Sequence, residues 1–487
     1  HQAVQCRGVM IVREVVMYPL VEFPELVQHY APFFEEVFTA EAFIEFKRYV
    51  SGLIVSENKT VDGINRLFVT ESRNQSSLNR LLTESPFSLE ELNRVRLSML
   101  ASLPGTAIKP KGVLGVDDTL LQHYGQDFEK IAKLFDHVSQ SYVWAHDLVT
   151  IHYSDEETDY PVMFQLWEPM ELEKVEAGLR SAGIALKVSK EKLKETDPNK
   201  WRSYVLGVWQ RQQKKHKELG ELYDSKLILV EKMLTQWVAE HPDAHLPVTF
   251  DSWFTQPDFC KFLDRELKLA YVGTLSGKDP VTLKTGLLPL EKFAERLKQE
   301  HLAAIAHSGK PIFHRITIPF KGEQETYFSY CRTHRIHNFG RQCLVINYRQ
   351  EDLSDNPTFY ISNRLIWHAA GITRIRRHRW PVEVYHEEGK AEGLDQYQLR
   401  DFQAVQRHVA LVAVVYSLLR AAQHDSVLRG RLQRILHQDL EGHPAAGRRT
   451  AQAQSLWALA LFINAGLAQG HSLHRILDPL IQTMCRA

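Results

Sequence analysis

The sequence predicts an α/β protein with helical regions at both ends. Apolar residues follow the helical period near both termini, whereas short alternating and continuous apolar runs typical of strands fill the middle of the chain. Strand-forming residues then dominate from about residue 310 to 360. At 487 residues the chain is too long for one simple core, so two to four domains are expected.

The first hundred residues read as helical. Residues 40–55 carry apolar side chains at helical spacing, and residues 85–103 open with a serine suited to a helix cap. Between them, residues 59–82 predict two short helices joined by a polar turn, which is compatible with a helix-turn-helix. The breaker PGTAIKPKG ends this part, so residues 1–105 are predicted to form a helical DNA-binding region.

Strand patterns begin after that breaker. Residues 112–121, GVLGVDDTLL, predict a strand that ends at its two aspartates, and residues 146–154 and 160–169 predict strands around an acidic turn. A polar helical region at 170–220 and an amphipathic helix at 221–241 follow. We then expect a buried strand that ends on Asp251, a helix and another strand, which complete the predicted region 106–280.

The segment RHRWPVEVYHEEGK lies beyond the β-rich stretch. Proline is tolerated at the first position of a helix, so a helix is expected to begin near Pro381 after a basic, strand-like approach. This helix would carry Glu383, Glu387 and Lys390 on one face, which suits either a solvated amphipathic helix or an acidic site. A long buried helix at 404–422 and a helical tail from Ala451 complete the chain.

The overall charge argues against a uniformly basic surface. Lys plus Arg and Asp plus Glu each number 59, although residues 374–379 form a local basic cluster. Residues 200–217 mix cations with Trp201 and Trp209, a pattern that suits a phosphate backbone and an exposed amphipathic helix equally well. Five scattered cysteines predict reduced thiols in the cytosol, and no apolar run is long enough to cross a membrane.

One group of zinc-ligand types is interpreted as structural. Cys331, His334, His337 and Cys343 lie in one segment, but their spacing differs from that of paired zinc ligands. Alternation along a strand would send Cys331 and His334 to opposite faces. A strand–turn–strand explains the segment, so no zinc is expected.

Three acids are candidates for catalysis because of their context. An aspartate of the pair Asp117 and Asp118 ends one predicted strand, Asp251 ends another, and Glu383 opens a helix. Carboxylate oxygens on a sheet edge and a facing helix are the hard ligands that Mg²⁺ and Mn²⁺ require. Two such ions about 4 Å apart can promote the displacement of a phosphodiester.

At these residues the chain resembles the DDE transposases of bacterial insertion sequences. That family places its first aspartate on a core strand before a threonine, here GVDDTLL, and its second after the fourth strand, here VTFDSWF. Its glutamate lies in the signature Tyr-x2-Arg-x3-Glu-x6-Lys, which Arg379, Glu383 and Lys390 match, with Arg376 at the tyrosine position. The resemblance extends from about residue 111 to 420.

The resemblance leaves the first aspartate open between two neighbours. Some branches of the family place the acid directly before the threonine, which selects Asp118, and others leave one residue between them, which selects Asp117. Neighbouring side chains of a strand point to opposite faces, so only one of the two can face the metal ions. Asp118 is the preferred prediction.

The resemblance also implies a fold. Its core is RNase H-like, of the retroviral-integrase superfamily, with a mixed five-stranded sheet and flanking helices. Residues 106–280 would form the first part of this core and residues 363–440 the second part with the glutamate helix. A β-rich insertion domain would occupy residues 281–362, and residues 441–487 would form a helical C-terminal region.

The implied activity is Mg²⁺-dependent cutting of DNA at the element ends and joining of those ends to target DNA. Asp118, Asp251 and Glu383 would be catalytic and would hold Mg²⁺, with Mn²⁺ as a substitute, and Arg379, Lys390, Arg376 and Arg377 would bind DNA. The implied partners are double-stranded terminal inverted repeats and target DNA, bound by a homodimer in the bacterial cytoplasm. Two alternatives remain: an inactive DNA-binding relative and a stand-alone RNase H-like nuclease.

Overall fold

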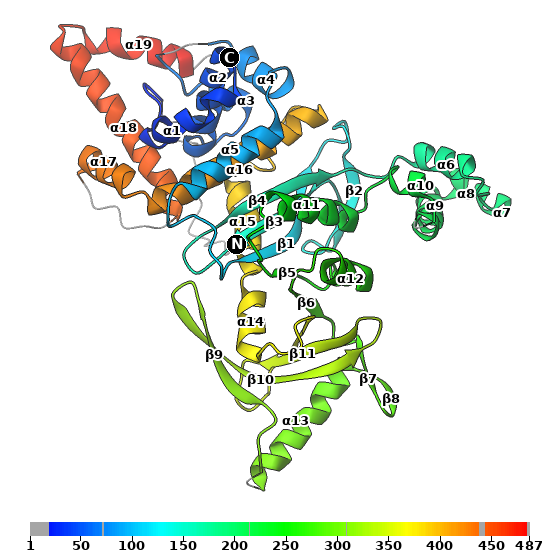
Figure 1. The fold of residues 1–487 in the computed structure, drawn as a ribbon. Coiled ribbons are helices and arrows are strands. Elements are labelled where there is room, and N and C mark those ends of the chain that lie inside the picture. Colours follow the sequence, from blue (N-terminus) through cyan, green and yellow to red (C-terminus); the bar gives the residue numbers. More distant parts are fainter. Residues whose placement is uncertain (1–18, 71–72, 214, 308, 438–443, 485–487) are drawn as a thin grey trace, which may run out of the picture. The chain divides into compact units, whose positions relative to one another are not determined.

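The computed structural model describes residues 19–70, 73–213, 215–307, 309–437 and 444–484. The chain divides into two compact units, one made of residues 1–106 and 388–487 and the other of residues 107–387 (Figure 1). Helix α15 (Trp380–Ala391) carries the chain from the second unit back into the first. Each unit is compact by itself.

The first unit is helical and surrounds one long core helix. That helix, α16 (Phe402–His424), begins where the Asp401 side chain accepts a hydrogen bond from the backbone N–H of Ala404. It contacts helices from both ends of the chain. The other helices are α1 (Glu25–Tyr30), η1 (Ala31–Val37), α2 (Ala40–Val55), α3 (Val61–Asn65), α4 (Gln75–Thr83), α5 (Leu89–Ala101), α17 (Ser426–Leu436), α18 (Pro444–Ala468) and α19 (Leu473–Met484).

Helix α16 is also the one helix in the described part of the chain with the length and composition of a membrane span. Of its 18-residue apolar window, 83% is buried, which is the pattern of a core helix. Buried polar contacts hold it to its neighbours: Arg96 of α5 donates to the Ser417 hydroxyl at 2.8 Å, and the Tyr49 hydroxyl lies 2.8 Å from His408 Nδ1. The predicted N-terminal helices and the long buried helix are confirmed.

The second unit is built on a mixed sheet, which has twelve strands among the described residues, in the order β2-β3-β1-β5-β6-β12-β11-β10-β7-β8, with β4 beside β3 and β9 beside β10. Neighbours β1, β5 and β6 are parallel, and the other pairs are antiparallel. The strands are β1 (Val113–His123), β2 (Ala132–Asp136), β3 (Ser141–Ser154), β4 (Asp159–Trp167), β5 (Val248–Phe250), β6 (Tyr271–Leu275), β7 (Pro280–Leu283), β8 (Gly286–Pro289), β9 (His314–Phe320), β10 (Glu323–Ile336), β11 (Gly340–Tyr348) and β12 (Thr358–Ser362).

The helices of this unit lie between and beside the strands. Helices α6 to α10 follow β4 and precede α11 in the sequence and form a separate helical segment, at the right of Figure 1, and α14 leads into α15. The helices are α6 (Leu172–Ser181), α7 (Val188–Glu191), α8 (Leu193–Thr196), α9 (Pro198–Gln212), α10 (Lys217–Gly220), α11 (Lys226–Glu240), α12 (Pro257–Arg265), α13 (Leu290–Ala306) and α14 (Ala369–Arg377).

Two expectations about elements were wrong. Strand β1 does not end at its aspartates, because β3 pairs with it as far as His123. The basic approach to Pro381 is helix α14, with Ile372 and Ile375 buried one turn apart, and not a strand. The sheet continues beyond β6, because β12 pairs with β6 and extends the hydrogen-bonded ladder into β11 and β10.

The basic, aromatic segment at 200–217 has a buried aromatic side. Trp201 and Trp209 of α9 pack with Val175 and Leu179 of α6 in a small apolar cluster. The Trp201 indole N–H donates to Glu176, and the Trp209 indole N–H donates to the Leu219 carbonyl at 2.7 Å. These tryptophans therefore hold the helical segment together and are not exposed surfaces for stacking DNA bases.

Candidate active site

The parallel pairing of β1 with β5 brings two aspartates to the same level. Val116 pairs with Phe250, so the next residues along each strand, Asp117 and Asp251, lie side by side at the end of β5. Neighbouring residues of paired strands point to the same face of the sheet. Asp251 also accepts hydrogen bonds from the backbone N–H groups of Trp253 and Phe254, at 2.9 and 3.1 Å, which fixes the turn after β5.

The junction of α14 and α15 brings Arg379 and Glu383 to that face. A Cβ atom added at Gly115 would lie 3.5 Å from the Cα atom of Arg379 and 3.6 Å from the carbonyl oxygen of His378. Gly115 precedes Asp117 by two residues and therefore lies on the same face of β1. The absent side chain lets the helix junction approach the strand closely.

Arg379 joins the acids of the sheet and the helix. Its Nη1 atom donates to Asp117 Oδ2 at 2.6 Å, and its Nη2 atom is bound to Glu383 Oε1. The Arg379 residue is only 8% exposed. One buried guanidinium thus bridges two carboxylates from distant parts of the sequence.

The electrostatics of Asp117 reflect this gathering of acids. Burial raises the pKa of Asp117 to about 7; the Arg379 cation opposes this shift, and the charges of Asp118, Asp251 and Glu383 add to it. Asp251 and Glu383 act on the same carboxyl group, so the three acids lie within one electrostatic site. A cation placed among them would relieve their repulsion.

Asp118, the preferred first aspartate, has different partners. Its Oδ2 atom accepts from Lys226 Nζ of α11 at 2.7 Å, and the same ammonium is paired with the buried carboxylate of Asp147. Burial by itself lowers the pKa of Lys226, but the charges of Asp147 and Asp118 outweigh burial, so the pKa is raised. Burial and the Asp118 charge raise the pKa of Asp147. Asp118 thus belongs to an ion cluster with α11.

Two of the other predicted DNA-binding cations, Arg376 and Arg377, donate hydrogen bonds to the protein. Arg376 Nε donates to Thr274 Oγ1 at 2.6 Å; burial lowers the pKa of its guanidinium, while the charges of Asp251 and Glu383 oppose that shift. Arg377 Nε donates to Glu325 Oε1 at 3.0 Å. Lys390 follows Glu383 on α15, after the chain has passed into the other unit.

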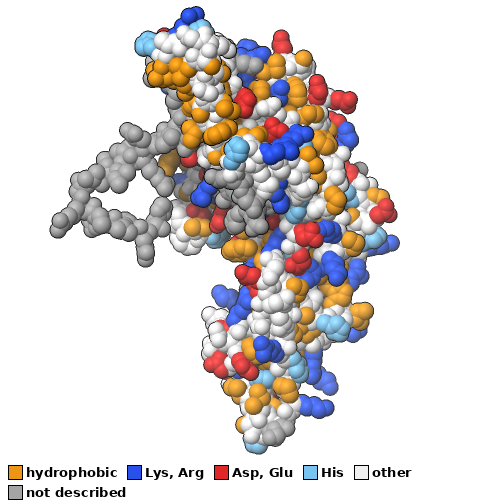
Figure 2. All heavy atoms as spheres, turned by 90° about the vertical axis from the view of Figure 1, so that its left-hand side faces the viewer, with side chains coloured by type: hydrophobic (Ala, Val, Ile, Leu, Met, Phe, Trp, Pro, Cys, Tyr) orange, Lys and Arg blue, Asp and Glu red, His pale blue; other side chains and the backbone are white. Residues whose placement is uncertain are grey.

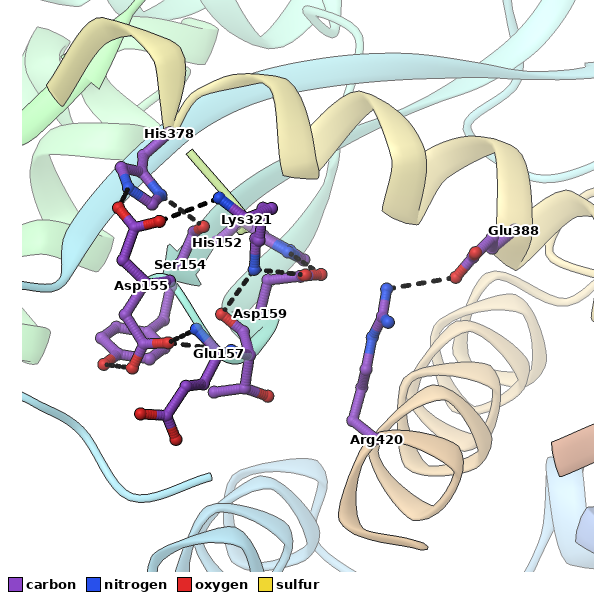
Figure 3. Close-up of polar contacts among 12 residues, drawn as sticks. His152, Ser154, Asp155, Glu157, Asp159, Lys321, His378, Glu388 and Arg420 are labelled. Carbon is purple, nitrogen blue, oxygen red and sulfur yellow. Dashed lines mark hydrogen bonds and ion pairs between the residues drawn. The ribbon is translucent and has the colours of Figure 1, made fainter. Parts of the chain in front are cut away.

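A polar network anchors the residue before Arg379. His378 Nδ1 lies 2.9 Å from the Ser154 hydroxyl of β3, and His378 Nε2 lies 3.0 Å from Glu156 Oε1 in the β3–β4 turn (Figure 3). The other oxygen of Glu156 accepts the backbone N–H of Lys321 at 2.8 Å. Burial lowers the pKa of His378 to about 4. This network ties the α14–α15 junction to two hairpin turns.

The carboxylate oxygens of the site are suitable ligands for a divalent cation, but two of the carboxylates are paired with Arg379. Asp117, Asp251 and Glu383 supply oxygens of the kind that Mg²⁺ and Mn²⁺ bind. In the described part of the chain, no three His, Cys, Asp or Glu side chains form a ready metal site. Arg379 supplies the positive charge between Asp117 and Glu383. A metal ion would require these carboxylates to leave the guanidinium.

A comparison with protein families matches residues 32–289 to the family described as DDE superfamily endonuclease. The match covers just over half of the chain, including Asp117, Asp118 and Asp251. The chain belongs to the DDE superfamily endonucleases. No curated protein matches it. The predicted resemblance is confirmed, and DDE superfamily nucleases generally use divalent metal ions and act on DNA.

Sequence reasoning missed several parts of this DDE endonuclease site. Lys226 carries no signal in the sequence, since it is one lysine in an ordinary amphipathic helix. His378 and Glu156 are 222 residues apart and are joined only by the fold. Asp117 could have been chosen over Asp118 because it lies opposite Asp251. That choice requires the register between β1 and β5, which the sequence does not give.

Proposed function

We propose that this DDE endonuclease is a transposase that cuts DNA at the ends of an insertion sequence and joins them to target DNA. The observation that carries the proposal is the convergence of Asp117, Asp251 and Glu383, with Arg379 between two of them. Three carboxylates and an arginine around one position suit charge stabilisation at a phosphodiester.

We assign the first catalytic aspartate to Asp117 rather than to Asp118. Two observations support the assignment: the strand register places Asp117 beside Asp251, and Asp117 accepts a hydrogen bond from Arg379. Asp118 is paired with Lys226 and has a structural role in this proposal. Asp251 and Glu383 keep the roles that the family signature implies.

In the proposed reaction, Asp117, Asp251 and Glu383 hold divalent metal ions. When bound, Mg²⁺ or Mn²⁺ would activate the attacking oxygen and stabilise the leaving oxygen. Arg379 would exchange its carboxylate partners for a phosphate oxygen of DNA, because a guanidinium can donate two parallel hydrogen bonds to either group. His378, Ser154 and Glu156 would hold the helix junction while Arg379 changes partner.

The architecture supports an RNase H-like core. Strands β4, β3, β1, β5 and β6 lie in that order, with β3 antiparallel to β1 and with β5 and β6 parallel to it. In the proposal, β7 to β12 with α13 form the insertion domain, predicted at residues 281–362. Strand β7 begins one residue earlier, at Pro280. The helical regions 1–105 and 441–487 contribute DNA binding and assembly.

We propose a homodimer on DNA, as the family resemblance implies for an enzyme that pairs two element ends. Support comes from α18, where residues 450–470 contain no Asp, Glu, Lys or Arg. Leu456 and Leu461 are 55% and 54% exposed, and Trp457 and Phe462 are also exposed. Hydrophobic side chains gather over the α18–α19 end in the upper part of Figure 2. An uncharged apolar helix surface of this kind suits a second copy of the chain.

Cleavage of a labelled duplex that carries the element end tests the activity. Wild type with Mg²⁺ is expected to cut this duplex, and Asp251→Asn and Glu383→Gln are expected to cut at least about 100-fold more slowly. Cleavage at the wild-type rate by either variant would remove that residue from the site.

The runner-up function is a stand-alone nuclease with the same acids. The two functions differ in what happens to the released 3′-hydroxyl. Joining of the labelled end to a second duplex supports a transposase, and cutting without joining under both Mg²⁺ and Mn²⁺ supports a nuclease.

A further inference from the structure

We propose that a groove of the 107–387 unit, at the opposite ends of the strands from the acids, binds the phosphodiester backbone of DNA. The groove has a volume of about 640 Å³ and is lined by residues along α12, from Pro257 to Arg265, and by the turn between β10 and β11. Its cations are Lys261, Arg265, Arg335 and Arg341. The inference rests on the proposed function, since DNA is the substrate there.

The cations of this groove exceed its anions. In the described parts of the chain, Arg265, Arg335 and Arg341 have no carboxylate partner within ion-pair distance. Asp264 is the one acid of the lining, and its Oδ1 atom accepts from Asn363 Nδ2 at 2.7 Å. The exposed cations of the groove are therefore available to an anionic ligand.

The sheet itself makes two of the arginines repel each other. Arg335 of β10 and Arg341 of β11 are directly paired across the antiparallel ladder. Directly opposed residues have Cβ atoms about 5 Å apart, and like charges there destabilise the pairing. A bound phosphate between the two guanidiniums would turn this repulsion into two charge-assisted contacts.

The lining suits a chain of phosphates better than a single small anion. Arg265 lies on α12 and the arginine pair lies on the hairpin, so the cations face the groove from two sides. The turn adds the polar side chains of His337 and Asn338. Spaced arginines and amide donors in an open groove are the usual contacts of a DNA backbone.

The strand register places the groove away from the bond that is cut. Tyr271, in the groove lining, pairs with Val248, three residues before Asp251. With a rise of about 3.3 Å per residue and about 4.8 Å between strands, Arg335 lies roughly 20–25 Å from Asp251. At about 3.4 Å per base pair, the groove would meet DNA about six or more base pairs from the cut, or a second duplex.

The test compares Arg335→Glu/Arg341→Glu with a control of equal charge change, Lys292→Glu/Lys310→Glu, on exposed positions of α13 and the loop after it. DNA binding is measured by salt titration in EDTA, so that the result does not depend on the catalytic acids or on metal ions. Loss of two phosphate contacts is expected to reduce the salt slope by about 2 in the groove variant and by clearly less in the control.

Two further arms identify the source of the phosphates. The groove variant is compared with wild type on a long duplex and on one that ends about four base pairs from the cut. Loss of affinity for the long duplex alone would show that the groove binds the flank of the same duplex. A variant that binds one duplex normally but fails to capture a labelled second duplex assigns it to target DNA.

Arg335→Lys/Arg341→Lys separates charge from folding, because it keeps both cations and should keep most of the slope. A groove variant with a normal melting temperature and a salt slope equal to that of the control would overturn the proposal. Loss of slope in the groove variant, together with normal binding by cleavage-dead Asp251→Asn, would support the groove even if the proposed transposition failed.

Discussion

Asp117 and Asp118 are adjacent in sequence, but their side chains serve different sites. Because β1 continues past them, alternation sends one to the face of Arg379 and the other to Lys226 of α11. The sequence predicts that only one of the two can face the metal ions. It cannot say which, because the answer depends on the register of β1 with β5 and on the position of a lysine 108 residues away.

The first prediction concerns these two aspartates. Asp117→Asn should reduce DNA cleavage by more than about 100-fold, because a metal-binding oxygen is lost. Asp118→Asn should keep cleavage within about tenfold of wild type, since its partner Lys226 still has Asp147. Single-turnover cleavage rates with Mg²⁺ measure both, and the reverse order of activities would restore Asp118 as the catalytic residue.

The second prediction concerns the ion cluster under β1. Lys226→Met should lower the free energy of unfolding by about 3 kcal/mol at pH 7, because it leaves the buried Asp147 carboxylate and the half-buried Asp118 carboxylate without their cation. Urea denaturation measures the loss, and Lys226→Arg, which keeps the charge, should be much closer to wild type.

The same variant has a predictable pH dependence. The folded-state pKa of Asp147 is raised, so the folded protein holds a proton that the unfolded chain has already released, and this lowers stability as pH rises. Removing the ammonium raises that pKa further. The destabilisation of Lys226→Met should therefore grow as pH rises through the raised folded-state pKa that Asp147 has in the wild type, and a loss that is larger at low pH would contradict the assignment.

At the level of elements, the site depends on how closely the α14–α15 junction approaches β1. The junction meets the strand at Gly115, and His378 fixes it to Ser154 and Glu156. Sequence patterns predicted the helix at Pro381 and most of the strands, because periodicity and caps are local. They failed for α14, since a short helix rich in arginine has too few apolar residues to separate it from a strand.

The third prediction uses that approach. Gly115→Ala should keep activity, because its Cβ atom would meet Arg379 and His378 at 3.5 and 3.6 Å, which is ordinary contact. Gly115→Val adds two methyl groups at the same place and should push the junction away, at a cost of about 1–3 kcal/mol. Thermal melts and cleavage rates measure this, with cleavage reduced more than about tenfold in a folded Gly115→Val.

Equal activity of folded Gly115→Val and Gly115→Ala would show that the junction tolerates displacement. The close approach would then have no part in positioning Arg379.

At the level of the whole molecule, each unit joins segments that are distant in the sequence. Helices α1, α2, α4 and α5 from the start of the chain pack around α16 with α17 and α18, and β12 joins β6 to extend the sheet. The helices predicted near both ends and the strands predicted in the middle are present in the structure. The sequence did not indicate that the helices of the two ends pack into one unit. Long-range contacts depend on side chains that find each other only in the folded chain, such as Arg96 with Ser417.

The fourth prediction concerns assembly. Leu461→Asp/Phe462→Asp places two charges on the exposed surface of α18 and should shift the protein toward monomers, because charges in the centre of an apolar interface are costly. Light scattering after size exclusion, with and without DNA ends, measures the mass. Leu473→Asp on the exposed part of α19 provides a comparison, and an unchanged dimer in the double variant would exclude this surface.

The proposal that Asp117, Asp251 and Glu383 share divalent metal ions is tested most directly by titrating the protein with Mn²⁺ and following free Mn²⁺ by electron paramagnetic resonance. We predict that Asp117→Asn, Asp251→Asn and Glu383→Gln each weaken Mn²⁺ binding by at least about tenfold, whereas Asp118→Asn does not. Wild-type Mn²⁺ affinity in any of the first three variants, or its loss in Asp118→Asn, would contradict the proposed site.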